Sequence, residues 1–239
     1  MAYIEGFVAA VPAANEQAYR KHVAEAAPLF KEFGVTRMVE TWGEEIPDGK
    51  VTDFKGSVQA KAGEVVVFSW MEYPSKEARD AAHPKIMGDP RMKAVGAAMP
   101  FDGKRMIYAG FAPIVEESTG GKTGYVDGSI VAVPAANKAA YRAMQAKAAA
   151  AIREHGATRV VEAWGDDVPD GKVTDFKKAV KAKGDETVVL AFIEWPSKDV
   201  RNAAWPKLMA DPRLHGDADK KIFDAQRRIY GGFAPILDA

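Results

Sequence analysis

The sequence contains no cysteine, so neither disulfides nor thiolate metal ligands are available to the chain. Its 33 basic side chains are balanced by 33 acidic ones, and the absence of a basic stripe argues against a nucleic-acid partner. No stretch approaches the ~20 apolar residues that cross a bilayer, and residues 1–5 lack the basic start of a signal peptide. We therefore expect a cytoplasmic protein that binds neither nucleic acid nor membrane.

Histidine is also scarce, and its four positions show no metal-ligand spacing: His22, His83, His155 and His215. His83 is the one candidate for a haem ligand, although a partly exposed helix histidine is the simpler interpretation. Glycine-rich phosphate loops and the Gly-x-Ser-x-Gly element of serine hydrolases are missing. The sequence predicts neither a cofactor nor a metal ion.

What the sequence does contain is one long stretch written twice, at residues 40–54 and 162–176. The repeat extends over the whole chain, because Gly128 follows Gly6 by 122 residues and Arg213 follows Arg91 by the same number. Roughly half of the aligned positions are identical, which marks an internal duplication. A polar, glycine-rich linker over residues 118–124 separates two predicted domains, residues 1–117 and 125–239.

Each copy shows the element order β-α-β-β-α-β. In the first copy, β-branched and aromatic runs predict strands near residues 3–11, 36–42, 64–73 and 105–111. Helical spacing predicts a helix from Asn15 to Gly34 and a second one that is capped by Ser75 and either kinked or interrupted at Pro84. This order indicates an α+β protein of two tandem ferredoxin-like modules. We expect them to pack sheet to sheet as a pseudo-dimeric α/β barrel, with helices outside and the chain monomeric.

Several motifs carry a family resemblance: Trp-Gly at 42–43, Asp-Gly-Lys-Val-Thr-Asp-Phe at 48–54, Val-Val-Phe-Ser-Trp at 66–70, Asp-Pro-Arg-Met at 89–92 and Met-Pro-Phe-Asp-Gly-Lys-Arg-Met-Ile-Tyr at 99–108. Together they resemble the YbaA-like family of bacterial proteins, whose function is unknown. The resemblance covers nearly the whole chain, once per half. It implies the dimeric α/β-barrel fold, whose wider superfamily includes cofactor-free monooxygenases, small isomerases and haem enzymes.

The second half departs from this pattern. Phe-Ser-Trp at 68–70 becomes Leu-Ala-Phe at 190–192, and His83 becomes Trp205. If both halves carry a site, the two sites are therefore not equivalent.

Strand alternation suggests which side chains face the space between the halves. We place Tyr3, Glu5 and Phe7 on one inward face, with Met38, Glu40 and Trp42 on the next and Phe68, Trp70 and Glu72 on the third; their repeats follow. Buried carboxylates can serve as acids or bases, and aromatic walls suit a small ligand. The candidate catalytic residues are thus Glu40, Glu72, Glu162 and Glu194, and the candidate ligand contacts are Trp42, Trp70, Trp164 and Phe192. In the alternative interpretation, these carboxylates are solvated or pair with Arg37, Arg105, Arg159 and Arg227.

Two further clusters each have two interpretations. Asp102 and Arg105 precede the last strand of the first copy, where they either bind an anionic ligand group or form a surface turn. Asp53 and Asp175 either reach over a cavity mouth or cap the short segments that follow them.

The inward tryptophans and carboxylates favour a cofactor-independent enzyme acting on a small aromatic or polyketide-like compound bound between the sheets. The alternative is a barrel that binds a small molecule without turnover, or a structural or stress-associated barrel filled by its own side chains.

Overall fold

Eight antiparallel strands form one closed barrel in a computed structural model that describes residues 2–214 and 222–239. The strands follow the barrel in the order β1-β3-β2-β8-β5-β7-β6-β4, and β4 pairs with β1 to close it. Their bounds are β1 Tyr3–Pro12, β2 Arg37–Glu45, β3 Glu64–Tyr73, β4 Ile107–Ser118, β5 Tyr125–Pro134, β6 Arg159–Asp167, β7 Glu186–Trp195 and β8 Ile229–Asp238. The fold is therefore mixed α+β around an eight-stranded barrel, as the sequence predicts.

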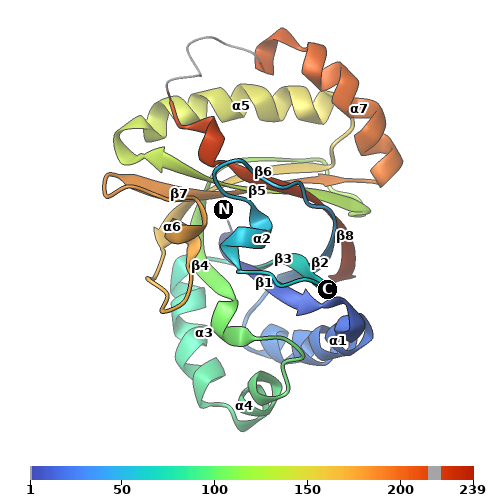
Figure 1. Cartoon of the computed structure of the whole chain (residues 1–239), viewed down its shortest axis with the longest axis vertical. Helices are drawn as coiled ribbons and strands as arrows, with labels where there is room; N and C mark the ends of the chain where they lie inside the picture. The colour runs from blue at the N-terminus through green and yellow to red at the C-terminus, as the bar shows by residue number, and fades with distance from the viewer. Residues whose placement is uncertain (1, 215–221) are drawn as a thin grey trace.

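The long helices cover the barrel from outside, on two opposite sides (Figure 1). One side carries the helices of the first half and the other side those of the second half. Their bounds are α1 Glu16–Glu32, α3 Lys76–Gly88, α4 Pro90–Ala97, α5 Lys138–Glu154 and α7 Lys198–Ala210. In the described part of the chain, none of the helices is both long and apolar enough to cross a membrane.

Local signals explain most helix ends. Ser75 caps α3 by accepting a hydrogen bond from the backbone N–H of Ala78, as predicted. Asn15 was expected to cap α1, but its side chain instead donates to the Pro100 carbonyl at 2.8 Å. Pro84 lies within α3, which continues to Gly88, so the helix is not interrupted there.

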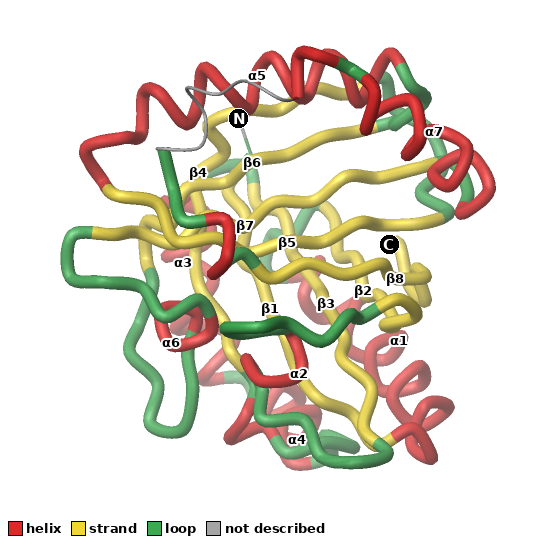
Figure 2. The backbone as a smooth tube through the Cα atoms, turned by 45° about the horizontal axis from the view of Figure 1, so that its top comes forward, coloured by secondary structure: helices red, strands yellow, loops and turns green. Residues whose placement is uncertain are grey.

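The two halves join at their strand edges, which the expected sheet-to-sheet packing did not include. Each half contributes four neighbouring strands, and β4 pairs with β6 while β8 pairs with β2 (Figure 2). All strand edges are thereby hydrogen-bonded within one chain.

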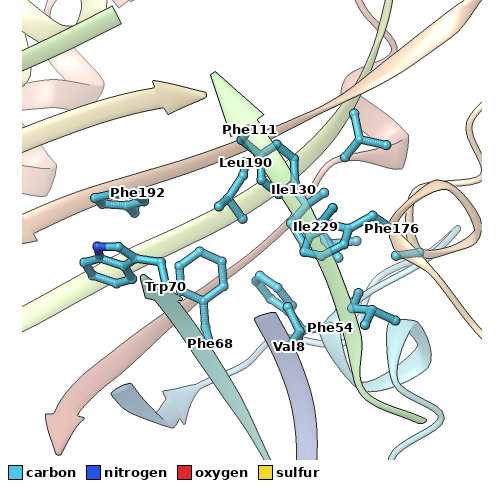
Figure 3. Close-up of a cluster of buried hydrophobic side chains, with 14 of the residues drawn as sticks. Val8, Phe54, Phe68, Trp70, Phe111, Ile130, Phe176, Leu190, Phe192 and Ile229 are labelled. Carbon is cyan, nitrogen blue, oxygen red and sulfur yellow. The ribbon is translucent and has the colours of Figure 1, made fainter. Parts of the chain in front are cut away.

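The interior of the barrel is filled by its own side chains. Trp70 and Phe192 stack inside it with ring centroids 4.2 Å apart, and Phe68 packs beside Trp70 (Figure 3). Phe111 belongs to the same core and packs against Phe176. The short helices α2 (Phe54–Ser57) and α6 (Phe176–Ala179) insert their first residues into one end. The proposed ligand space between the sheets is thus occupied by a core of aromatic and aliphatic residues.

Strand alternation was predicted correctly, but two of the three inward faces were assigned to the wrong side of the sheet. On β1, Ile4 and Val8 point into the barrel, so the predicted inward set Tyr3, Glu5 and Phe7 points outward to the helices. The face of β2 that carries Met38, Glu40 and Trp42 is reversed in the same way.

Glu40 on β2 lies opposite Ser69 on β3, and directly opposite residues share a face. Since Phe68, Trp70 and Glu72 point into the barrel, Ser69 and Glu40 point outward to the helices. Both faces of these strands are buried, so hydrophobicity alone does not distinguish them.

Candidate ligand pocket

The end of the barrel opposite α2 and α6 carries six charged residues that we call the barrel-end network: Arg37, Glu72, Glu116, Arg159, Glu194 and Asp238. Each half supplies an arginine to the other half's glutamate. Arg159 Nη1 lies 2.6 Å from Glu72 Oε1, and Arg37 Nη2 lies 2.7 Å from Glu194 Oε2.

Glu72 and Glu194, two of the four candidate catalytic acids, therefore belong to ion pairs. Trp70 Nε1 also donates to Glu72 at 3.1 Å, and the Thr123 hydroxyl donates to Glu194. With several donors on each carboxylate, the network holds the two halves together, and the carboxylate oxygens of Glu72 and Glu194 are engaged by protein donors. For Glu72 and Glu194 the alternative interpretation, pairing with Arg37 and Arg159, describes the structure.

The third candidate, Glu40, is buried between the sheet and α1. The Tyr19 hydroxyl donates to its Oε2 at 2.7 Å, and the Ser69 hydroxyl donates to the same oxygen. Burial raises the pKa of Glu40 to about 6, and the two hydrogen bonds oppose this rise. Trp42 packs beside Tyr19 in the surrounding apolar cluster, so this acid is enclosed by protein.

The fourth candidate, Glu162, has the same position in the second half but fewer partners. Tyr141 donates to its Oε2 at 2.7 Å, while Ala191 takes the place of Ser69 and offers no hydroxyl. Burial raises the pKa of Glu162 to about 7, and the Tyr141 hydrogen bond and the positive charge of Arg228 oppose the rise. A carboxyl of this kind exchanges its proton near neutral pH.

Glu162 lines a pocket of about 1200 Å³ between the outer face of the second half's sheet and helices α5 and α7. We call it the α5–α7 pocket. Its polar lining includes Ser129, Gln145, Glu162 and Arg228, and its apolar lining includes Ile152, Val160, Leu208 and Trp205. Large apolar walls with a few polar groups are typical of small-molecule sites.

The pocket is lined by smaller or polar side chains at several positions where the first half has larger apolar ones. Phe7, Phe30 and Met38 of the first half pack into one continuous cluster between sheet and helices. At the repeat positions stand Ser129, Ile152 and Val160, which remove ring and thioether volume. The corresponding cluster of the second half is divided in two, with the pocket between the parts.

Two polar replacements face the same pocket. Gln145 stands where the first half has the buried Val23, and Arg228 stands where it has Met106. Trp205 also lines the pocket, and its buried indole Nε1 has no hydrogen-bond acceptor in the described part of the chain. Comparison of the two copies could have revealed these positions, but only the fold shows that they are neighbours.

Among the remaining predicted contacts, Phe192 is one of the residues that line the pocket, although its ring stacks on Trp70 inside the barrel. Asp102, Arg105 and Trp164 are not part of the pocket lining. Arg105 is buried and binds Glu64 at 2.7 Å and Asp102 at 3.0 Å, so its donors are engaged within the chain. Trp164 packs near Tyr141 with Lys138 5.1 Å from its ring centroid. Neither group of residues meets Glu162 across the pocket lining.

Asp53 and Asp175 act as helix caps. Asp53 accepts from Gly56 N at 2.7 Å, and Asp175 accepts from Lys178 N at 2.7 Å. These bonds position Phe54 and Phe176 at the mouth of the filled barrel, which agrees with the second interpretation of this pair.

No cluster of three metal-ligating side chains occurs in residues 2–214 and 222–239. His83 is exposed on α3, and His215 lies outside the described residues.

Comparison with known proteins places the chain in a family. Residues 2–103 and 124–225 each match the family described as "Protein of unknown function (DUF1428)". The chain belongs to this family. "Uncharacterized protein YbaA" of Escherichia coli (strain K12) is 63% identical over 117 residues, which are 49% of this chain and 100% of that protein.

Solved structures with the same fold are far more distant in sequence. A "putative monooxygenase" of Fusobacterium nucleatum has a TM-score of 0.63 at 9% identity, covering 99% of this chain and 93% of its own. Another "putative monooxygenase", from Lactobacillus acidophilus NCFM, has a TM-score of 0.59 at 10% identity, covering 100% and 96%. At these identities the likeness shows the fold alone.

Proposed function

We propose that the chain is a cofactor-independent enzyme that binds a small aromatic or otherwise largely apolar molecule in the α5–α7 pocket and moves a proton on it through Glu162. The observation that carries this proposal is a buried carboxyl group on the wall of a large pocket. The same position in the other half is enclosed by packed side chains.

The chemistry needs only groups of the chain. The carboxylate of Glu162 accepts a proton from an acidic C–H or O–H of the ligand, which becomes an enolate or phenolate. Protonated Glu162 then returns the proton to another atom of the ligand, so the net change is an isomerisation that consumes no oxidant. Tyr141 fixes the carboxyl group through its 2.7 Å hydrogen bond.

We further propose that the architecture arose from two tandem ferredoxin-like modules, residues 1–117 and 125–239, joined by the linker 118–124. The 117-residue relative supports this division because its full length corresponds to about one copy. Since each half closes the other's open strand edges, we expect the chain to be a monomer with an internal pseudo-dimer.

A proton-exchange assay tests the catalytic part of the proposal. In D₂O at pD 7.5, proton NMR follows deuterium incorporation into 2-tetralone, an aromatic ketone with acidic C–H groups. We expect the protein to accelerate exchange and Glu162→Gln to lower that rate by at least about 100-fold. Glu40→Gln is the matched control, because the same change is made in the enclosed site of the first half.

Equal exchange rates in the unaltered protein and in Glu162→Gln would refute the assignment of Glu162. Binding of the ketone without accelerated exchange would favour the alternative, a barrel that holds a small molecule without turnover.

A further inference from the structure

Of the three arginines that line the α5–α7 pocket in the described part of the chain, two form ion pairs with carboxylates, and the third, Arg228, does not do so within the described residues. Arg201 lies 2.7 Å from Asp127, and Arg213 lies 2.7 Å from Asp211. Arg228 instead donates to the Ser129 hydroxyl at 3.2 Å, and no carboxylate of residues 2–214 and 222–239 forms an ion pair with it. The pocket thus offers one arginine whose charge is not neutralised by a direct ion pair with the described chain.

The pair formed by Arg228 and Ser129 exists only in the second half. The first half has Met106 and Phe7 at these positions, and both pack against its apolar cluster. Ser129 lies on β5, and Arg228 directly precedes Ile229, the first residue of the neighbouring strand β8. Where the first half has the apolar side chains of Met106 and Phe7, the second half therefore has the charge of Arg228 and the hydroxyl of Ser129.

We infer that the molecule bound in the α5–α7 pocket is a monoanionic aromatic or enolisable carboxylate whose carboxylate group is held by Arg228 and Ser129. This inference rests on the proposed function and names the ligand class of the same site. The ligand's apolar body lies against Ile152, Val160 and Trp205.

A single negative charge fits the site better than a phosphate. One arginine and one hydroxyl match the two oxygens of a carboxylate in charge and donor number. A dianionic phosphate would bring a second negative charge toward Glu162, which lines the same pocket. Binding of the carboxylate by Arg228 and Ser129 also orients the ligand, because the apolar end of the ligand then points to the opposite wall of the pocket.

Binding of a carboxylate next to Arg228 should also change the protonation of Glu162. The positive charge of Arg228 opposes the rise in the pKa of Glu162. A bound carboxylate neutralises that charge, so Glu162 takes up a proton more readily in the complex. Binding of the carboxylate at pH 7.5 should therefore be accompanied by net proton uptake, measurable by calorimetry in buffers of different ionisation enthalpy.

A matched pair of probes tests the inference on the full chain. 2-Naphthoate is anionic at pH 7.5, while 2-naphthamide has nearly the same shape and is neutral. We expect isothermal titration calorimetry to show at least 10-fold tighter binding of 2-naphthoate, with proton uptake for that probe only. In Arg228→Met this preference should disappear while the affinity for 2-naphthamide changes less than about 3-fold.

The substitution copies the methionine that the first half carries at this position, so we expect the fold to tolerate it. Arg228→Gln is a second variant that removes the charge while keeping polarity, and exposed Lys104→Met is the control for charge removal elsewhere. Equal affinities of the unaltered protein for both probes, or a preference for 2-naphthoate that survives in both Arg228 variants, would overturn the inference and leave the proposed function standing. Failure of both probes to bind would overturn the two together.

Discussion

Replacing Ser129 by phenylalanine should fill the part of the α5–α7 pocket next to Arg228, because the first half already shows how the ring fits. Phe7 occupies the repeat position, is half-buried, and stacks on Tyr108 with ring centroids 6.5 Å apart. Ser129 pairs in register with Tyr230, just as Phe7 pairs with Tyr108. The introduced ring therefore has an aromatic neighbour and the same strand geometry.

The expected magnitude follows from the burial of that ring. Complete burial of a phenylalanine side chain stabilises by about 1.5–3 kcal/mol, and half-burial at this position by about 1 kcal/mol. For a chain of this size that corresponds to a rise of roughly 2–4 °C in Tm. The reverse change, Phe7→Ser, removes a ring from a packed cluster and should destabilise by about 2 kcal/mol.

The assay combines urea unfolding with titration of 2-naphthamide, the neutral probe whose binding does not depend on Arg228. We expect Ser129→Phe to unfold at a higher urea concentration and to bind the probe at least 10-fold more weakly. Ser129→Ala is the control, since it removes the hydroxyl without filling space. Unchanged affinity in Ser129→Phe, or a loss of stability of several kcal/mol, would refute the packing argument.

Three further changes test other parts of the structure. Glu162→Gln should stabilise the protein by up to about 3 kcal/mol at pH 8 and should not change its stability at pH 4. The reason is that the pKa of Glu162 is raised from 4.5 to about 7 in the folded state, so ionisation of this carboxyl costs free energy only there. Urea unfolding at both pH values measures the difference. Arg159→Met should cost about 3–5 kcal/mol in thermal or urea unfolding, since it leaves buried Glu72 without its closest partner. Asp53→Ala should cost about 1 kcal/mol through loss of the α2 cap.

The controls for these changes come from the same chain. Lys55→Met breaks an exposed ion pair with Asp48 and should change stability by less than about 1 kcal/mol, in contrast to Arg159→Met. Asp53→Asn retains a capping oxygen and should behave nearly as the unaltered protein. A pH-independent effect of Glu162→Gln would contradict the assigned shift in its pKa.

The repeat and the element order were sufficient to predict a barrel, because two copies of one module must cover each other's sheets. The side chains that fill the barrel were also predicted in part, since Phe68, Trp70 and Glu72 do face inward. Glu40 on β2 and Glu5 on β1 were placed on the wrong face, because alternation separates two faces without identifying the one that meets the helices. For Glu40, only the pairing with Ser69 decides this.

The pocket itself was not predicted. Its signal is a set of differences between the copies, such as Phe7 against Ser129 and Met106 against Arg228. Each difference alone resembles ordinary surface variation. Their meaning depends on β5, β8, α5 and α7 bringing them to one place, which is long-range information that local patterns do not carry.

The site of ligand binding can be seen in a crystal structure of the full chain soaked with 2-naphthoate. We expect electron density for the naphthyl ring between α5, α7 and the sheet of the second half, with the carboxylate against Arg228 and Ser129 and the ring near Glu162. Density in the first half next to Glu40, or a soaked crystal in which the α5–α7 pocket holds no ligand at saturating concentration, would contradict this expectation.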